Sequence, residues 1–409
     1  MDFTTSLAAL VAGRLILAYS SIPSYVEDHH LLSSPLSAFS RLKEGLYLYE
    51  NDVDPYSGGP CYHSPLYLSL FSTILPTSTT LIPFLWTLVD AIAAWALVNI
   101  WRARQGRKET ERDHFIAALY LLNPYLVFPS LAYSTSTFEN ALQLLSLMFG
   151  SRGNTSASLL TLSFLIHLSP TSLIILPPTL MLLLILDPSS HLANPRLFPL
   201  APKDALPRLR TLLGSFLGYS TVLACASTLI AGGTGWISRV WGAPLLLPDL
   251  TPNVGLWWYF FTEMFDHFRP FFLIVFSMHL IIYTAPLCIK FQHDPLYAAF
   301  LLLGVLGAFK PYPTLADPGL FLTMIGIFPE TFAYLRYPIV TALLHLHSAL
   351  LLPLFHQLWL VQGTGNANFF YASTLVFGVS NGAALADCIW AGLRIAVGEV
   401  GEGRQVIQE

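Results

Sequence analysis

The stretch "TLIPFLWTLVDAIAAWALVNIW" (Thr80–Trp101), followed at once by "RARQGRK" (Arg102–Lys108), decides the fold of this chain. A helix that crosses a membrane needs about 20 predominantly apolar residues, and this stretch contains one ionisable side chain, Asp90. Clustered lysine and arginine residues mark the cytoplasmic end of such a helix. The sequence therefore predicts a membrane-spanning helix whose C-terminal end lies in the cytoplasm.

The whole chain has the composition of a membrane protein. Of its 409 residues, 54% are hydrophobic and 11% are charged, whereas soluble domains carry about 25% charged residues. The net charge of −4 at pH 7 indicates no nucleic-acid partner. The four cysteines are far apart and show neither CxxC nor metal-ligand spacing, so we expect buried free thiols, no metal site and no cofactor.

Twelve apolar segments are candidate spans, and several of them are short and interrupted by proline. They are Phe3–Tyr19, Thr80–Trp101, His114–Ala132, Phe138–Gly150, Ala157–Leu168, Ser172–Leu186, Thr211–Ala231, Phe271–Lys290, Leu296–Ala308, Gly319–Tyr334, Tyr337–Val361 and Phe369–Ile395. No fixed-period repeat or long linker divides the chain. We therefore expect an all-α, polytopic membrane protein of about twelve transmembrane helices, forming one domain over residues 1–409.

The basic residues predict the orientation of these spans. They gather in the loops at residues 102–113 and 187–210, the second with Arg196, Lys203, Arg208 and Arg210, and both loops should be cytoplasmic. That assignment requires Tyr62–Pro76 to form a shallow helix on the other side rather than a span. The polar segments then share the lumenal face: Ser21–Cys61, Tyr133–Thr137, Gly232–Pro270, Lys310–Pro318 and Gly363–Asn368.

The first lumenal loop, residues 21–61, carries the carboxylates that a membrane glycosyltransferase would need. Such enzymes use a carboxylate as general base toward the acceptor hydroxyl, and Asp52 or Asp54 could take that role with a dolichol-phosphate sugar as donor. The alternative is a solvated loop in which Asp54-Pro55 starts a turn. The adjacent His29 and His30 have no third metal ligand in a recognisable spacing.

A strongly aromatic segment, Thr251–Phe272, contains Glu263, Asp266 and His267. If it is helical, offsets of three and four place these side chains on one face, and Thr251 would cap the helix. We expect an interfacial helix at the lumenal boundary that contacts water, a polar ligand or another subunit.

Three further motifs each have a structural and a functional interpretation. Ser136 and Glu139 have the spacing of a capping box. Lys310 flanks a proline-rich turn and could contact a phosphate at headgroup depth. Asn366 and Asn368 precede an aromatic run and could bind sugar hydroxyls, or Asn368 could be a simple helix cap.

Charged groups inside predicted spans should be paired or face a wet cavity, because an isolated charge in lipid is costly. Arg14, Asp90 and Asp387 are such groups. We expect a structural pair between Arg14 and a carboxylate. A transport pathway is less favoured, because no internal duplication accompanies these charges.

The chain resembles the PIG-U family, the polytopic subunit of the glycosylphosphatidylinositol (GPI) transamidase. The motifs that carry the resemblance extend over nearly the whole chain in the family's order, and the block of twenty-one residues is the most specific. They are "PYSG" (Pro55–Gly58), "LLNPY" (Leu121–Tyr125), "PDLTPNVGLWWYFFTEMFDHF" (Pro248–Phe268), "FKPYPT" (Phe309–Thr314) and "NFFYA" (Asn368–Ala372).

This resemblance implies a scaffold related in fold to GT-C glycosyltransferases, located in the endoplasmic reticulum membrane. It implies a non-catalytic subunit that binds or presents the GPI lipid, with partners that include a cysteine-protease-like catalytic chain. Residues expected at the lipid or glycan are Asn366, Asn368, Phe369, Tyr371 and Lys310; residues expected at the lumenal rim are Asp249, Asn253, Glu263, Asp266 and His267. The alternatives are an active GT-C mannosyltransferase and a pure assembly scaffold without lipid contact.

Overall fold

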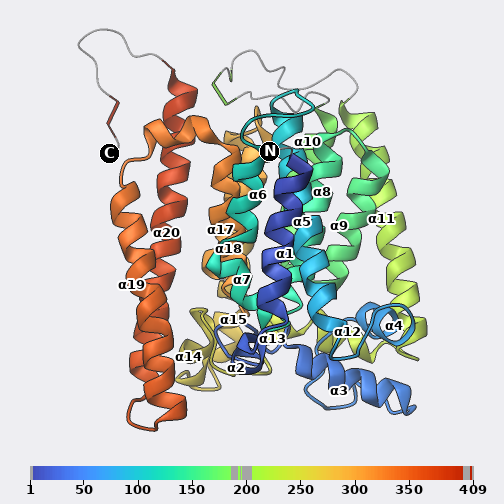
Figure 1. Ribbon diagram of the computed structural model, residues 1–409. Coiled ribbons are helices and arrows are strands. Elements are labelled where there is room, and N and C mark those ends of the chain that lie inside the picture. Colours follow the sequence, from blue (N-terminus) through green and yellow to red (C-terminus); the bar gives the residue numbers. More distant parts are fainter. Residues whose placement is uncertain (1–2, 186–191, 194, 196–204, 399–405, 408–409) are drawn as a thin grey trace.

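The computed structural model describes residues 3–185, 192–193, 195, 205–398 and 406–407, and these residues contain helices and turns but no β-strand. Figure 1 shows a bundle of upright helices with short helices gathered at its lower end. The helices of the bundle are α1 (Phe3–Ala18), α5 (Ile82–Arg104), α6 (Asp113–Leu121), α7 (Pro124–Leu131), α8 (Ser136–Ser151), α9 (Thr155–Leu168), α10 (Leu176–Leu184), α11 (Ala205–Ile230), α15 (Arg269–Ile282), α16 (Thr284–Lys290), α17 (Pro295–Phe309), α18 (Ala316–Met324), α19 (Pro338–His356) and α20 (Ala367–Val397).

The short helices of the lower end belong to the segments that the sequence assigns to the lumen. They are α2 (Ile22–Val26), α3 (Phe39–Glu50), α4 (Pro65–Thr73), α12 (Gly235–Val240), α13 (Ala243–Leu246) and α14 (Trp257–Thr262). The described residues also contain three short 3-10 helices, η1 (Pro170–Ile175), η3 (Ile325–Ile327) and η4 (Pro329–Tyr334), and one π-helical segment, η5 (Gln357–Val361).

The upper end carries the N-terminus, the connection from α5 to α6 and the last turns of α20 (Figure 1). The basic loop at residues 102–113 is therefore at the end opposite the polar segments. Of the second basic loop, Arg208 and Arg210 lie in the first turns of α11, whereas Arg196 and Lys203 lie outside the described residues. Which side of a membrane each end faces stays a prediction.

The centre of the bundle is built from helices that are apolar on every side. All residues of α17 except its last, Phe309, are buried, as expected for a helix without a polar face. Helices α17 and α18 approach closely, because a Cβ on Gly307 would lie 2.9 Å from the Cα of Pro318. Small residues permit such contacts between membrane helices, and this one fixes the position of Lys310 just after α17.

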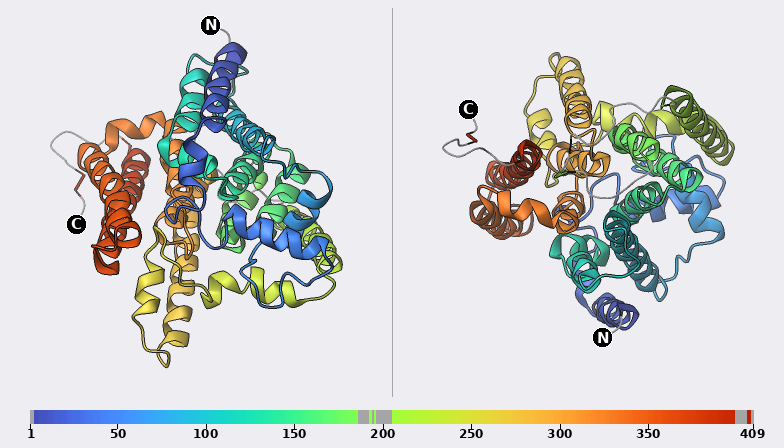
Figure 2. Two further views of the ribbon diagram at one scale, coloured as in Figure 1. Left: turned by 60° about the horizontal axis from the view of Figure 1, so that its bottom comes forward. Right: turned by 90° about the horizontal axis from the view of Figure 1, so that it is seen from above.

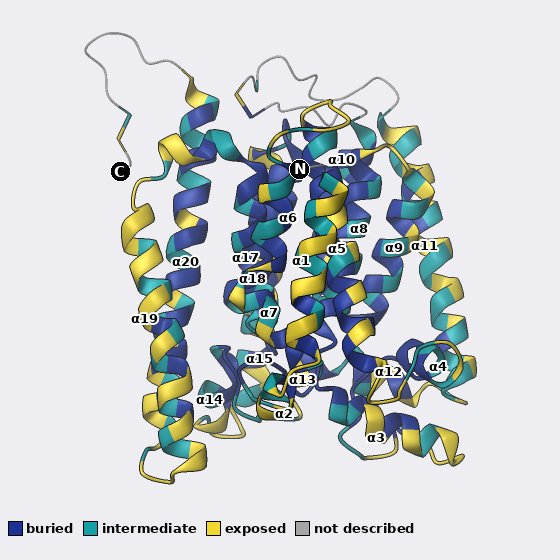
Figure 3. Ribbon diagram, in the orientation of Figure 1, coloured by how far each residue is buried: buried dark blue, intermediate teal, exposed yellow. Residues whose placement is uncertain are grey.

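The periphery has the opposite character. Figure 3 shows exposed and partly buried residues along α11 and α19, with few buried ones. Only 11% of the most apolar window of each is buried, against 72% in α5. Seen from above in Figure 2, α19 and α20 form a pair at the edge of the bundle. Exposed apolar helices of this kind are suited to contact with lipid.

The expected count of about twelve spans is only partly supported. Each predicted span coincides with one to three consecutive helical segments, but within the described part of the chain five helices are long and apolar enough to cross a membrane. A sixth arises if α6 and α7, bent by 49° where Pro124 interrupts the hydrogen-bond ladder, form one span. The remaining apolar helices are short because proline and glycine turns break them.

Helix α4 lies at the lower end beside α3 (Figure 1). It has nine residues, about 14 Å at 1.5 Å per residue, which is too short to cross a hydrocarbon core of about 30 Å. Tyr62–Pro76 therefore contains a short helix that does not cross, as the orientation of the basic loops required.

The charges inside the bundle are paired. Arg14 forms an ion pair with Asp90, and the Ser130 hydroxyl donates to the same carboxylate at 2.6 Å. Asp387 accepts hydrogen bonds from the backbone N–H groups of Arg336 (2.6 Å) and Tyr337 (3.0 Å). The expected pairing of Arg14 with a carboxylate is confirmed, and Asp387 closes the turn before α19.

The buried ion pairs of one further charged residue could not be predicted from the sequence. Arg104 is completely buried and pairs with Asp294 and Glu330, each at 2.7 Å. Its partners are about 190 and 226 positions away along the chain, so only the tertiary structure reveals them. The four cysteines are free, and all except Cys225 are buried.

Candidate functional site

The lower end places the residues predicted for the lipid or glycan in two separate clusters. We call Trp258, Tyr259, Asn366, Asn368, Phe369 and Tyr371 the amide–aromatic cluster, and Lys310, Glu139 and Asp317 the lysine cluster. The first joins α14 to the beginning of α20, and the second joins α8 to the connection between α17 and α18. The described contacts do not link Lys310 to either asparagine.

The amide–aromatic cluster is organised around Asn368. The Tyr259 hydroxyl donates a hydrogen bond to Asn368 Oδ1, while the Tyr371 hydroxyl donates to the Leu256 carbonyl at 3.0 Å. The two tyrosine rings lie 4.7 Å apart between centroids. Asn368 is exposed, and its Nδ2 group has no hydrogen-bond partner among the described residues, so two N–H donors remain available to a ligand.

Asn366 has a structural role that the sequence assigned to its neighbour. It is the N-cap of α20, and its Oδ1 accepts a hydrogen bond from the Phe369 backbone N–H at 3.2 Å. The expectation that Asn368 could be the cap is therefore wrong, because α20 begins at Ala367 and its cap lies two positions before Asn368. Because a cap uses only the carbonyl oxygen of the amide, the exposed Nδ2 group of Asn366 remains free to donate.

Aromatic rings form a wall beside these amides. Trp258 stacks on Trp359 with ring centroids 6.0 Å apart, and Phe355 stacks on Phe369 at 5.8 Å. Trp258 is buried, whereas 55% of Phe369 is exposed. Amide donors next to an exposed aromatic face form an arrangement suited to a sugar or a lipid headgroup.

The lysine cluster differs in charge and burial. The Lys310 ammonium lies 3.0 Å from Glu139 and 2.9 Å from Asp317. Burial by itself lowers the pKa of Lys310, but the carboxylates of Asp317 and Glu139 outweigh it and raise that pKa above its ordinary value. With two carboxylates and one ammonium, the cluster carries a net negative charge and is a poor site for a phosphate.

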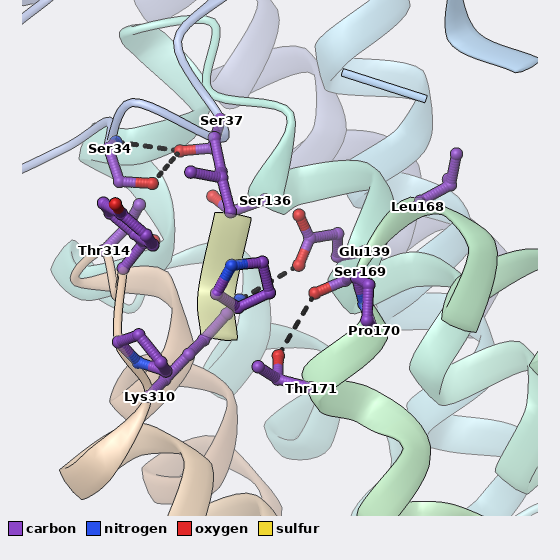
Figure 4. A pocket seen from close by; sticks show the side chains of 14 residues that line it. Ser34, Ser37, Ser136, Glu139, Leu168, Ser169, Pro170, Thr171, Lys310 and Thr314 are labelled. Atoms are coloured by element: carbon purple, nitrogen blue, oxygen red, sulfur yellow. Dashed lines mark hydrogen bonds and ion pairs between the residues drawn. The ribbon is translucent and has the colours of Figure 1, made fainter. Parts of the chain in front are cut away.

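Figure 4 shows the cavity next to this cluster, with Lys310 pointing toward Glu139 and hydroxyl groups on several sides. The hydroxyls belong to Ser34, Ser37, Ser136, Ser169, Thr171 and Thr314. The cavity measures about 20 Å³, which accommodates roughly one water molecule. It is too small for a sugar ring, so its polar groups stabilise the packing of the lower end.

The capping box expected at the start of α8 is absent. The N-cap is Thr135, which makes no side-chain capping hydrogen bond, and Ser136 instead shares a hydrogen bond with Ser134 at 2.9 Å. Glu139 turns to Lys310, 171 positions away. A long-range ion pair has displaced the local motif because the buried ammonium requires a counter-charge.

Two predicted rim residues, Asp249 and Asn253, build the loop that leads to α14. Asp249 accepts hydrogen bonds from Arg41 (2.7 Å) and from the Thr251 hydroxyl (2.5 Å). Burial raises the pKa of Asp249, but the bonds from Thr251 and Arg41 outweigh it and hold that pKa below its usual range. Asn253 is fully buried and accepts from the Gly255 backbone N–H at 2.8 Å.

The other rim residues, Glu263, Asp266 and His267, lie on an exposed turn rather than on one helical face. Helix α14 begins at Trp257 and ends at Thr262, and α15 begins only at Arg269. The prediction of one helix capped by Thr251 is therefore wrong. Thr251 bonds Asp249 instead, and the crowded aromatic rings of α14 and α15 favour two short helices packed against each other.

A histidine group beside the amide–aromatic cluster was missed from the sequence. His30 Nδ1 lies 3.2 Å from His356 Nε2, and the rings of His29 and His356 have centroids 4.2 Å apart. Burial and the neighbouring His30 lower the pKa of His29 to about 4. His356 precedes η5 and its ring lies 5.7 Å from that of Phe370, so these histidines attach the first loop to the helix pair α19–α20.

The carboxylates considered for a transferase lie elsewhere in the first loop. Asp52 and Asp54 are exposed, and Asp54 Oδ1 accepts a hydrogen bond from the Tyr56 backbone N–H at 2.9 Å. This is an Asx-turn, the structural interpretation of the motif. Glu27 pairs with Lys43 at 3.0 Å at a cavity of about 310 Å³ that also borders Tyr19 and Tyr133.

Comparisons with known proteins all indicate the same family. Residues 8–377 match the family model "GPI transamidase subunit PIG-U". The GPI transamidase component GAB1 of Saccharomyces cerevisiae is 33% identical over 97% of this chain and 96% of its own length. The human GPI-anchor transamidase component PIGU is 30% identical over 95% of this chain and 93% of its own, and the GAB1 homolog of Schizosaccharomyces pombe is 31% identical over 92% and 89%. Since the match extends over nearly the whole chain, the protein belongs to the PIG-U family of GPI transamidase subunits.

Proposed function

We propose that this protein is a non-catalytic subunit of the GPI transamidase in the endoplasmic reticulum membrane. In this proposal it binds the GPI lipid at the amide–aromatic cluster and presents it to a cysteine-protease-like catalytic subunit. The observation that carries the proposal is the pair of exposed amides, Asn366 and Asn368, whose N–H donors lie beside an exposed aromatic ring at the beginning of α20.

The chemistry of the cluster suits the glycan part of the lipid. Side-chain amides donate to sugar hydroxyls, and aromatic rings such as Phe369 pack on the apolar faces of sugar rings. We assign the glycan rather than the phosphate to this cluster, because Lys310, the cation expected to contact the phosphate, already pairs with Glu139 and Asp317.

The acyl chains would lie along the exposed apolar surface above the cluster. Leu375 and Val379 of α20 are exposed, as are four leucines spaced along α19, namely Leu343, Leu346, Leu350 and Leu354. Helices α19 and α20 both rise from the end of the bundle at which the cluster lies (Figure 1). A lipid can therefore contact the bundle with its tails while its headgroup reaches the amides.

Two observations favour a subunit over a single-chain enzyme. Cys61, the cysteine that lies in a lower loop, is buried, and burial raises its pKa to about 11. A neutral buried thiol is a poor nucleophile. Asp54, a candidate base for mannosyl transfer, accepts a hydrogen bond from the Tyr56 backbone N–H within its own turn.

The first experiment is a pull-down of the tagged full-length chain in mild detergent, followed by an assay of the eluate for GPI attachment to a precursor protein. Recovery of a protease-like chain together with attachment activity supports the subunit. Mannose transfer by the chain alone, lost on Asp52→Asn or Asp54→Asn, would establish the transferase instead.

The binding site is tested in cells that lack the native protein. Asn368→Ala should reduce the amount of a GPI-anchored reporter at the surface while the complex still assembles. The matched control is Tyr259→Phe, which removes the same intramolecular hydrogen bond but keeps the Asn368 amide. If Asn368→Ala lowers anchoring only in proportion to lost assembly, the pure scaffold is correct and the cluster has no lipid role.

A further inference from the structure

A basic cavity lies at the opposite end of the bundle, where α5 and α8 both terminate. Its volume is about 520 Å³, and its charged and polar lining consists of Arg102, Arg107, Lys108, Ser151 and Arg152. The turns that follow the two helices are made by Gly106 (φ +60°) and Gly153 (φ +73°). We propose that this basic pocket binds a phosphate-bearing anion, most simply the headgroup of an anionic phospholipid in the leaflet at the upper end.

The charge balance of the basic pocket favours an anion. Of its four cations, Arg102 is neutralised by Asp113 at 2.7 Å, which leaves three positive charges. The C-terminal ends of α5 and α8 each contribute about half a negative charge. The sum is roughly two positive charges, so an anion is attracted even after the helix dipoles are counted.

Two of the cations have no structural partner. Arg107 and Lys108 are exposed and make no ion pair or side-chain hydrogen bond within the described part of the chain. Arg152 donates to Asn99 Oδ1 through one nitrogen, and its other guanidinium donors remain available. Lysine and arginine residues that only set the orientation of membrane spans can lie anywhere in a cytoplasmic loop. These cations come from two loops 40 or more positions apart and line the same cavity.

An uncharged group in the lining supplies an independent indication. Ser151 is 3% exposed, and its hydroxyl has no hydrogen-bond partner in the part of the chain that the structure describes. A buried hydroxyl without a partner costs free energy. A phosphate oxygen in the basic pocket, which Ser151 lines, would accept this bond.

The location favours a lipid as the source of the phosphate. Basic pockets between membrane helices on the cytoplasmic side bind anionic headgroups, and the basic loop at residues 102–113 is the one predicted to be cytoplasmic. A free phosphate ion has the same chemistry, so the test must separate the two sources. The site lies at the other end of the bundle from the amide–aromatic cluster, and its test does not depend on the function proposed for that cluster.

The experiment measures lipid binding to the purified full-length chain in a neutral detergent by native mass spectrometry. The probes are phosphatidylinositol, phosphatidylcholine and inorganic phosphate. The variant Arg107→Gln/Lys108→Gln removes two cations of the pocket. The matched control, Arg210→Gln/Lys290→Gln, removes two exposed cations in α11 and α16 that do not line it.

We expect phosphatidylinositol to bind more tightly than phosphatidylcholine, and the pocket variant to lose affinity by about tenfold, while the control changes it by less than about twofold. Ser151→Ala, which leaves the charges intact, should also weaken binding. Inorganic phosphate that binds alone and is lost in the pocket variant would assign the free ion as ligand. Equal losses in pocket variant and control, or equal binding of the two phospholipids, would overturn the proposal.

Discussion

The lysine cluster and the amide–aromatic cluster lie at the same end of the bundle and use polar groups in opposite ways. Lys310 is only 11% exposed, and both of its neighbours are carboxylates within 3.0 Å. Asn366 and Asn368 are exposed and keep N–H donors without partners in the described residues. A buried group whose hydrogen-bond partners all lie within the protein stabilises the fold, whereas an exposed donor without a partner in the protein can bind a ligand.

The largest effect on stability is expected when the ammonium group of Lys310 is removed. Lys310→Met leaves Glu139 and Asp317 buried without a counter-charge, which should lower the free energy of unfolding by about 3–5 kcal/mol. Thermal unfolding of the purified chain in detergent measures the effect. The triple variant Lys310→Met/Glu139→Gln/Asp317→Asn should recover most of the stability, because no charge is then left unpaired. A single variant as stable as wild type would show that the cluster is not structural.

The histidine group predicts a pH dependence of intermediate size. The folded state holds the pKa of His29 at about 4, below the ordinary value of 6.5, so the unfolded state binds the extra proton more readily. Stability from His29 is therefore complete above pH 6.5 and is lost as the pH falls from 6.5 toward 4. Between pH 7.5 and pH 5 the loss should be about 1–2 kcal/mol after allowance for solvent screening.

The measurement is the melting temperature of the wild type and of His29→Asn at these two pH values. The variant should show a smaller difference between them. An equal difference in both proteins would assign the pH dependence to other groups.

Substitution of Asn366, the N-cap of α20, should have a smaller effect on the free energy of unfolding. Asn366→Ala removes the acceptor of the Phe369 N–H and should cost about 1 kcal/mol, whereas Asn366→Ser keeps an acceptor and should cost only a few tenths. Chemical denaturation of the two variants measures this difference. If Asn366→Ser folds normally but still reduces GPI attachment, the amide itself contributes to binding.

The smallest effect on stability is expected at Asn368. Its side chain is exposed and, among the described residues, makes a single hydrogen bond, which it accepts from Tyr259. Asn368→Ala should therefore change the free energy of unfolding by less than about 0.5 kcal/mol. Attachment of a GPI-anchored reporter should nevertheless fall. A variant that is destabilised by more than 1–2 kcal/mol would make Asn368 a structural residue like Lys310.

Much of the fold could be predicted because apolar length is a local property. The intervals predicted as spans coincide with one to three consecutive helical segments, and the short run at Tyr62–Pro76 contains the nine-residue α4. The count of full-length spans failed where proline and glycine divide one apolar interval into short helices. The continuous helix predicted over Thr251–Phe272 failed for a related reason, because aromatic packing between α14 and α15 outweighs local propensity.

The candidate site was predicted less completely. Asn366, Asn368 and Tyr371 were found together because they are adjacent in sequence, but the contribution of Tyr259 and the histidine group depends on contacts across more than 100 positions. Lys310 was grouped with the asparagines because its partners could not be seen. The spacing of Ser136 and Glu139 matched a local motif, and a distant ammonium changed its outcome.

By itself, the sequence determined that this is an all-helical membrane protein of the PIG-U family, because hydropathy and the twenty-one-residue motif are properties of consecutive residues. Only the tertiary structure decided which charges are paired and which amides are free. Ion pairs such as Arg104 with Glu330 join residues hundreds of positions apart, and their stability depends on burial. Burial is a property of the packed bundle and of no single segment.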